Sequence, residues 1–199
     1  MVIIERGVGG RTYQIWKQQQ ATSCGVASAW MARGIARQAS FAEEEWDLAK
    51  RIYLGAVNTA VNAASTIPGG PMTINPAAFR NVPQDQLQSS FQSNFSRAGL
   101  TCRQLVRALQ SEGLQAELYS NNDNPCSIID SKIAYNKPAI SFVSWARGGA
   151  HFVVVGRCTQ RHVTFLDPWT GHVNEQPNNG FFRASYNQGT ILVNIYVSA

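Results

Sequence analysis

Residues 23–37 read SCGVASAWMARGIAR, and this stretch decides the first half of the fold. The segment is rich in small residues, and its larger apolar side chains, such as Trp30 and Ile35, fall on or near one face of a helix. Ser23 stands at its start, where a serine hydroxyl can cap a helix. We therefore predict a closely packed helix with Cys24 in its first turn.

Further helices are expected on the C-terminal side of this one. The acids of FAEEEWDLAKRIYLGAVNTAV precede Lys50 and Arg51, an order that suits the helix dipole. Prolines and a Gly-Gly pair in residues 62–82 predict a long surface loop, and loops of that length usually have a function. Helical segments are also predicted at 83–99, 101–113 and 126–137.

The character of the chain changes after Pro138. Runs of β-branched and aromatic residues, separated by glycine-rich or polar turns, predict strands at 139–145, 151–158, 162–167 and 190–197. Shorter strands are expected at 10–17 and 115–120. Helices first and an antiparallel sheet last form an α+β pattern, which predicts one domain over residues 1–199, with a helical half at about 18–136 and a sheet half at about 137–199.

Composition narrows the class of protein. The chain has 199 residues, 44% of them hydrophobic and 15% charged, as expected for one globular domain. The net charge of +5 comes from scattered basic residues, so we expect no nucleic-acid partner. No apolar run reaches the ~20 residues of a membrane span. The N-terminus lacks the pattern of a signal peptide.

The four cysteines are Cys24, Cys102, Cys126 and Cys158. They are too few for a disulfide scaffold and include no CxxC pair that would indicate zinc. If one of them is a working thiolate, three remain, and an odd remainder suits a reducing compartment or buried free thiols. We therefore take the other three as structural.

Cys24, His151 and Asp167 together suggest nucleophilic chemistry. The start of a helix stabilises the thiolate, which is the form of cysteine that attacks. His151 opens a predicted strand after Gly-Gly-Ala and is the best candidate base. An antiparallel hairpin would return Asp167, at the end of the adjacent strand, to His151, where a carboxylate orients an imidazole.

An oxyanion also needs hydrogen-bond donors. Gln18, six residues before Cys24, can supply its side-chain amide beside the Cys24 backbone N–H, although Gln19 and Gln20 compete for that role. We expect no metal and no cofactor.

Other polar and aromatic residues have weaker settings. His162 and His172 are expected to face solvent, and Glu43 to Glu45 to form the N-terminal face of a helix. Trp169 follows Asp-Pro and either covers the pair of His151 and Asp167 or lies in the core. Trp145 and Arg147 either border the substrate cleft or belong to an exposed turn.

These motifs resemble the papain-like cysteine peptidase superfamily. The likeness rests on Gln18-x5-Cys24-Gly25, on Gly149-Ala150-His151 opening a strand, and on Asp167-Pro168. Within it the chain is most similar to the bacterial double-glycine leader peptidases and the avirulence-type effector proteases. The resemblance makes Cys24 the nucleophile, His151 the base, Asp167 the orienting acid and Gln18 the oxyanion-hole side chain, with the active-site cleft between the two halves. Residues 38–98 match nothing in the pattern.

The resemblance implies an endopeptidase that cleaves a protein or peptide substrate through a thioester intermediate, after small residues such as Gly-Gly. It also implies a bacterial effector or toxin, with a cognate inhibitor or immunity protein as a partner. We expect such a protein to act in a reducing cytosol after secretion or delivery by a specialised secretion system.

Two other functions remain open at this point. A glutamine deamidase or transglutaminase-like acyl transferase would use the same triad on a side-chain amide. A papain-like fold without activity would serve as a binding module.

Overall fold

The computed structural model describes residues 2–7, 10–52, 99–119, 136–159, 161–177, 182–184 and 187–199. The loop predicted at 62–82 and the helices predicted at 83–99 and 126–137 lie outside the described residues, apart from the last residues of those helices. Within these ranges the chain is an α+β protein with an antiparallel sheet, as the sequence predicts.

The first predicted helix is α1, Cys24–Arg37. Ser23 occupies the N-cap position as expected, but the prediction that its hydroxyl caps the helix is wrong. The hydroxyl instead accepts a hydrogen bond from Gln20 N (3.1 Å) and donates one to Gln20 O (3.0 Å). Ser23 therefore stabilises the turn before the helix.

Two further helical segments are described. Residues 45–52 are helical, so the second helix begins four residues later than the FAEEE motif suggested. The helix α5, Cys102–Ser111, begins with a capping box in which Thr101 and Gln104 exchange hydrogen bonds between side chain and backbone. It ends at Glu112, followed by Gly113 with φ of 77°.

The main sheet has seven described strands and is antiparallel. They are β3 (Gln115–Tyr119), β4 (Ala139–Trp145), β5 (Ala150–Cys158), β6 (His162–Asp167), β7 (His172–Pro177), β8 (Phe182–Ala184) and β9 (Asn187–Ser198). Their order is β3-β9-β4-β5-β6-β7, with β8 paired to β9. Strand β3, which belongs to the helical half of the sequence, forms one edge of this sheet.

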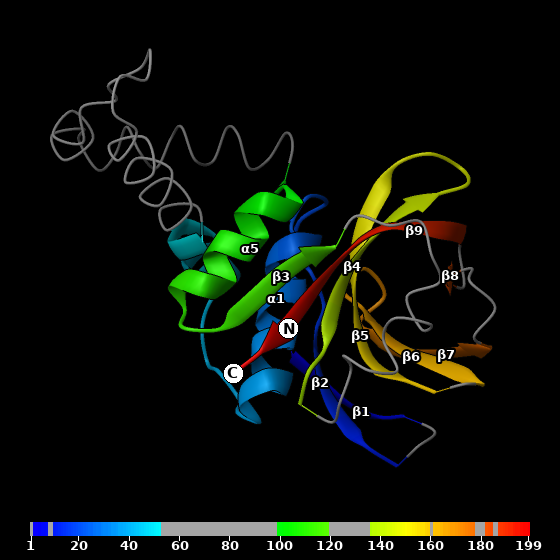
Figure 1. Ribbon diagram of the computed structural model, residues 1–199, viewed down its shortest axis with the longest axis horizontal. Coiled ribbons are helices and arrows are strands. Elements are labelled where there is room, and N and C mark those ends of the chain that lie inside the picture. The colour runs from blue at the N-terminus through cyan, green and yellow to red at the C-terminus, as the bar shows by residue number, and fades with distance from the viewer. Residues whose placement is uncertain are drawn as a thin grey trace, which may run out of the picture.

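The N-terminal strands form a separate two-stranded sheet. The strand predicted at 10–17 is β2 (Thr12–Trp16), and it pairs with β1 (Val2–Arg6). The strands β1, β7 and β8 are not among those predicted from the sequence. In β1 alternate residues are partly buried and the others are exposed, so its apolar residues are a weak indication of a strand. Figure 1 shows this hairpin at the end of the molecule away from α5.

A hydrophobic core joins α1 to the sheet. Figure 1 shows the helices on one side of the molecule and the strands β5, β6 and β7 on the other. Trp30 of α1 packs edge-on against Trp16 of β2, with ring centroids 4.9 Å apart, and both belong to the same cluster as Phe152 and Val154 of β5. The opposite face of the sheet has its own cluster, which includes Phe165.

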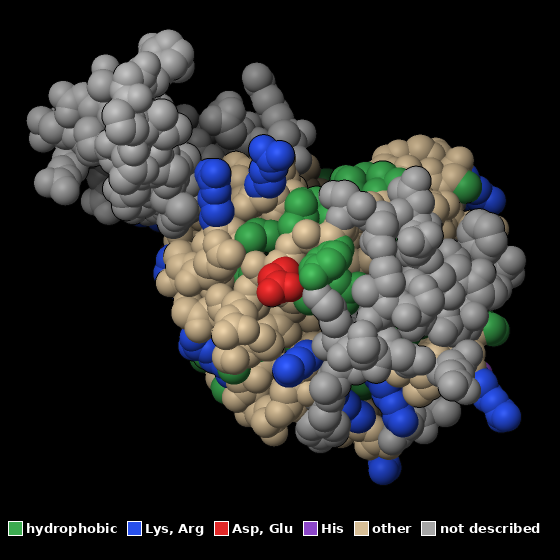
Figure 2. Space-filling model, viewed as in Figure 1, with side chains coloured by type: hydrophobic (Ala, Val, Ile, Leu, Met, Phe, Trp, Pro, Cys, Tyr) green, Lys and Arg blue, Asp and Glu red, His purple; other side chains and the backbone are tan. Residues whose placement is uncertain are grey.

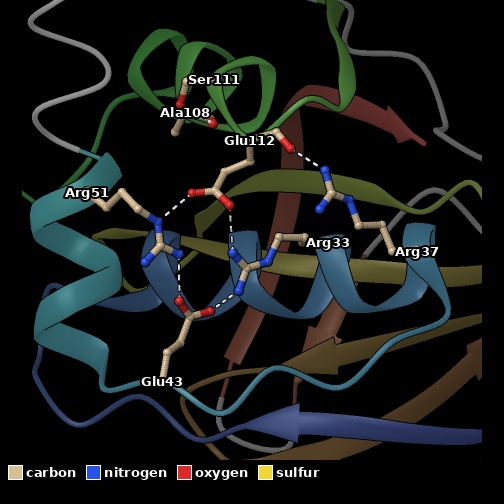
Figure 3. A network of polar contacts seen from close by, with 7 residues as sticks. All are labelled: Arg33, Arg37, Glu43, Arg51, Ala108, Ser111 and Glu112. Carbon is tan, nitrogen blue, oxygen red and sulfur yellow. Dashed lines mark hydrogen bonds and ion pairs between the residues drawn. The ribbon is translucent and has the colours of Figure 1, made fainter.

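Four charged side chains link α1 to the second helix and to the end of α5 (Figure 3). Arg33, whose side chain is 5% exposed, binds Glu43 and also Glu112, the latter at 2.9 Å. Arg51 binds the same two carboxylates, at 2.6 and 2.5 Å. Each charge thus has two partners of opposite sign, which offsets the cost of burying it.

On the face drawn in Figure 2, the Lys and Arg side chains of the described residues are separated from one another and form no continuous patch. This distribution agrees with the scattered basic residues of the sequence. Among the described residues, no helix is long and apolar enough to cross a membrane.

The network predicts a large loss of stability for Arg33→Ala. Removing Arg33 leaves two largely buried carboxylates with Arg51 as their remaining partner, so the free energy of unfolding should fall by about 2 to 4 kcal/mol. Urea denaturation measures it. Arg37→Ala is the matched control on the same helix, because Arg37 is exposed and binds the Glu112 carbonyl, and its loss should cost less than about 1 kcal/mol. Equal losses in the two variants would contradict the role given to Arg33.

Candidate active site

His151 and Asp167 form a buried pair on the sheet. Val154 lies opposite Leu166 in the β5–β6 register, so Asp167 falls opposite Val153, two residues from His151. Side chains two residues apart on a strand share a face, which makes His151 and Asp167 diagonal neighbours. His151 Nε2 lies 2.8 Å from Asp167 Oδ1, and the two side chains are 7% and 0% exposed.

The Asp167 carboxylate is held in place by the turn that follows it. Its Oδ1 also accepts a hydrogen bond from the Trp169 backbone N–H at 2.9 Å, and Gly171 N donates to the Asp167 carbonyl at 2.8 Å. Gly171 has a φ of 76°, which glycine adopts without strain. This turn between β6 and β7 fixes the carboxylate towards the histidine.

The imidazole of His151 has Cys24 as its other polar neighbour. Burial alone would lower the pKa of His151, but hydrogen bonds to Asp167 and Cys24, together with the negative charges of these groups, raise it from 6.5 to about 9. Since Nε2 faces Asp167, Nδ1 is the nitrogen left for the Cys24 thiol. The described geometry therefore favours an imidazolium flanked by two acidic groups.

Cys24 reaches His151 because α1 packs closely on β5. Gly25 makes this approach feasible: a Cβ at Gly25 would lie 3.3 Å from Leu100 Cβ and 3.4 Å from a ring carbon of Phe152. Phe152 is the residue after His151 on β5. Cys24, in the first turn of α1 and partly buried, is thus brought to the histidine by the contact between the helix and the sheet.

Gln18 lies between the helix that carries Cys24 and the turn that follows Asp167. Its backbone N donates to the Pro168 carbonyl at 2.8 Å, which links the turn before α1 to the turn after Asp167. Its side-chain Nε2 donates to the Gln20 carbonyl at 2.6 Å. An amide nitrogen carries two hydrogens, so one N–H is anchored and one remains for a ligand.

Comparison with known families assigns the chain. A profile of the peptidase C39 family matches residues 79–195, more than half of the sequence. The chain belongs to the peptidase C39 family. This is a family of cysteine peptidases related to the bacterial double-glycine leader peptidases, so the prediction of a cysteine peptidase is confirmed. A comparison with curated proteins gives no match.

The matched residues include His151 and Asp167, whereas Gln18 and Cys24 precede them. It is therefore the packing of α1, not the family match, that relates Cys24 to the other two residues. No cluster of three or more metal-ligating side chains occurs among the described residues of the peptidase.

The side chains of the remaining histidines of the peptidase do not join this pair, although His172 is the register partner of Asp167 on β7. His162 is exposed, and His172, 63% exposed, lies 3.5 Å from Glu5. Both face solvent, as predicted.

Two of the other cysteines can be described. Cys102 is a free thiol at the start of α5, and burial raises its pKa. Cys158 is disulfide-bonded, so the expectation of spare thiols is wrong for this residue.

Two tryptophans lie next to the pair. Trp169 is 51% exposed, which excludes the alternative that it is an ordinary core residue. Trp145 is buried, with its ring centroid 6.1 Å from that of His151 and the planes 32° apart. Arg147 is exposed in the turn that follows. Trp145, on β4, therefore borders the candidate site and does not belong to an exposed turn.

Glu45 lies at the N-terminal end of the second helix, as predicted, but its side chain does not face solvent. It is 1% exposed, and its Oε2 accepts a hydrogen bond from the Gln19 backbone N–H at 2.9 Å. The spacing of apolar residues in the sequence does indicate that this side chain is buried. Glu45 stands three, four and seven residues before Leu48, Ala49 and Ile52, on the buried face of the helix.

The raised pKa of His151 predicts the effect of Asp167→Asn. Replacing the carboxylate removes a charge-assisted hydrogen bond, so the His151 pKa should fall by about 1 to 2 pH units. Nuclear magnetic resonance titration of the imidazole signals measures it, with exposed His162, at the other end of β6, as the internal control. Because the folded pKa exceeds the unfolded value, the pair stabilises the fold fully below about pH 6.5, and this contribution is lost as the pH rises through about 9. An unchanged His151 pKa in the variant would contradict the assigned contact.

Proposed function

We propose that the peptidase cleaves peptide bonds with Cys24 as nucleophile, His151 as general acid and base, and Asp167 as the group that orients His151. The observation that carries the proposal is the buried His151 imidazole, which is hydrogen-bonded to Asp167 at 2.8 Å and has the Cys24 thiol close enough to help raise its pKa. A pair of this kind can hold a thiolate and an imidazolium at neutral pH. The papain-like arrangement, with the substrate bound between the helical and sheet halves, is part of the same proposal.

In the proposed reaction the Cys24 thiolate attacks the carbonyl carbon of the scissile bond. The negative oxygen that forms is stabilised by the free N–H of the Gln18 amide and by the Cys24 backbone N–H. The His151 imidazolium gives its proton to the leaving nitrogen as the C–N bond breaks, which leaves a thioester. Water then attacks the thioester, His151 accepts the proton of the water, and the acid product leaves with the thiolate restored.

Glycines border the site on the side of β5. Gly148 and Gly149 have φ of 94° and 85°, and a Cβ at either position would meet no atom within 4 Å. Open space beside bare backbone lets an extended substrate approach closely. Together with the relation of the family to double-glycine leader peptidases, this supports cleavage after small residues such as Gly-Gly.

We further propose that the peptidase is a delivered bacterial effector or toxin with a cognate inhibitor. This proposal rests on the resemblance of the motifs. Disulfides persist in oxidising compartments and are rare in the cytosol, so the disulfide at Cys158 favours an exported protein over one that stays in a reducing cytosol.

Alkylation tests the nucleophile and its partner. Iodoacetamide should label Cys24 of the native chain at pH 5, where an ordinary thiol is protonated and reacts slowly. The substitution His151→Ala should lower the rate of Cys24 alkylation at least roughly 10-fold. Mass spectrometry locates the adduct. Cys102 is the internal control, because burial disfavours its thiolate. If Cys24 and Cys102 react alike, or if His151→Ala has no effect, the triad is wrong.

Gln18→Ala tests the oxyanion hole separately. Alkylation by iodoacetamide forms no oxyanion, so its rate should be unchanged, whereas kcat for the p-nitrophenyl ester of N-acetyl-glycylglycine should fall about 100-fold. Release of p-nitrophenolate measures kcat. The same drop in Gln19→Ala but not in Gln18→Ala would transfer the role to Gln19.

Cleavage itself is tested with peptides in which Gly-Gly is followed by further residues, so that an ordinary peptide bond follows the second glycine. New termini, found by mass spectrometry, are the expected result with the native chain and should be absent with Cys24→Ala. Release of ammonia from glutamine side chains without new termini would indicate a deamidase instead.

A further inference from the structure

Glu45 is a buried acid that the proposed reaction does not use. Its carboxyl group lies beneath the turn that contains Gln18 to Ser23, directly before the candidate nucleophile. A carboxylate that is 1% exposed is costly to bury unless it makes hydrogen bonds. Glu44, the residue directly before the second helix, is exposed and has no such cost.

The contacts of Glu45 point to the turn, not to the helix on which it stands. Oε2 accepts from Gln19 N at 2.9 Å, and the Ser23 hydroxyl lies close enough to favour the charged carboxylate. Burial acts in the opposite sense and raises the pKa of Glu45. Oε1 has no hydrogen-bond partner among the described residues.

Hydrogen bonds along one short stretch of backbone connect Glu45 with the Gln18 amide, and the peptide bond from Gln19 to Gln20 joins them. Glu45 holds the Gln19 backbone, the Ser23 hydroxyl holds both backbone groups of Gln20, and the Gln20 carbonyl accepts from Gln18 Nε2 at 2.6 Å. The described contacts of the Gln18 side chain include no other hydrogen-bond partner, and its Oε1 is buried without one. The orientation of the amide therefore depends on where this turn places the Gln20 carbonyl.

We propose that Glu45 is a positioning residue that sets the oxyanion hole by fixing the turn from Gln18 to Ser23. The inference rests on the proposed function, because it takes Gln18 as the oxyanion donor. Its physical basis is preorganisation: a donor stabilises a developing charge only if it already points to the position of that charge, and a displacement of about 1 Å can cost as much as about 100-fold in rate.

The inference separates two reactions of the same cysteine. Alkylation of Cys24 by iodoacetamide needs the thiolate and His151 but forms no oxyanion. Hydrolysis of the p-nitrophenyl ester of N-acetyl-glycylglycine needs the oxyanion hole as well. A residue that acts through Gln18 should affect the second reaction and leave the first unchanged, whereas a residue that only maintains the fold should affect both.

The test compares Glu45→Ala, Glu45→Gln and the control Glu44→Ala on the full chain. We expect Glu45→Ala to lower kcat for the ester by as much as about 100-fold with unchanged alkylation of Cys24. Glu45→Gln should restore most of kcat, because the side-chain carbonyl of glutamine still accepts from Gln19 N. Glu44→Ala removes the same charge from the adjacent exposed position and should match the native chain.

The double variant Gln18→Ala/Glu45→Ala shows whether Glu45 acts through Gln18. If it does, the double variant is no slower than Gln18→Ala alone, because the positioned group is already absent. The inference is wrong if the effects of the two substitutions on kcat multiply in the double variant, or if Glu45→Ala keeps the native kcat. It is also wrong if both Glu45 variants lose alkylation and hydrolysis in parallel. Should Glu45→Ala fail to fold, Glu45→Met, whose side chain fills the buried space but cannot accept a hydrogen bond from Gln19 N, supplies the same comparison in the presence and absence of Gln18.

The native chain and His151→Ala distinguish this failure from that of the proposed function. If native alkylation does not depend on His151, or if the native chain does not hydrolyse the ester, the triad itself is wrong. If both hold and only the Glu45 comparison fails, the triad stands and Glu45 is a structural residue.

Discussion

The packing of α1 against β5 is the contact on which the site depends. Cys24 and His151 are separated by most of the sequence, and nothing local brings them together. The first turn of the helix approaches the strand closely because Gly25 has no side chain, which lets Leu100 and Phe152 fill the space beside it. The rest of α1 is fixed by the core around Trp30, so the cysteine at its N-terminus has one position relative to the sheet.

Polar contacts fix the two ends of this helix. Near its C-terminal end Arg33 shares two carboxylates with Arg51, which connects α1 to the second helix and α5 (Figure 3). Before its N-terminal end Glu45 of the same second helix binds the Gln19 backbone. The second helix therefore supports α1 at both ends, with a charge network at one end and a single buried carboxylate at the other. Of these two contacts, the one that Glu45 makes with the Gln19 backbone lies next to the candidate site.

The site itself combines two residues from one hairpin with two residues that long-range contacts bring to that hairpin. His151 and Asp167 belong to adjacent strands and meet through the register of one hairpin, which is local in sequence. Gln18 and Cys24 come from the N-terminal segment and meet this pair through long-range contacts, among them the hydrogen bond from Gln18 N to Pro168 O. The family match covers the hairpin and not the N-terminal segment, in agreement with this division. Catalysis in the proposed reaction requires both parts, and the turn from Gln18 to Ser23 is where they meet.

The sequence by itself determined what local patterns encode. It predicted α1 from its small residues, the strands β4, β5, β6 and β9 from their β-branched runs, and the nearness of His151 to Asp167 from hairpin spacing. It also identified the peptidase family through its motifs. The tertiary structure decided the rest: that the Ser23 hydroxyl binds Gln20 and does not cap the helix, that Trp145 packs near His151, and that Glu45 is buried beneath the turn. The physical reason is that periodicity and turn chemistry act over a few residues, whereas the partner of a polar side chain depends on which distant element packs against it.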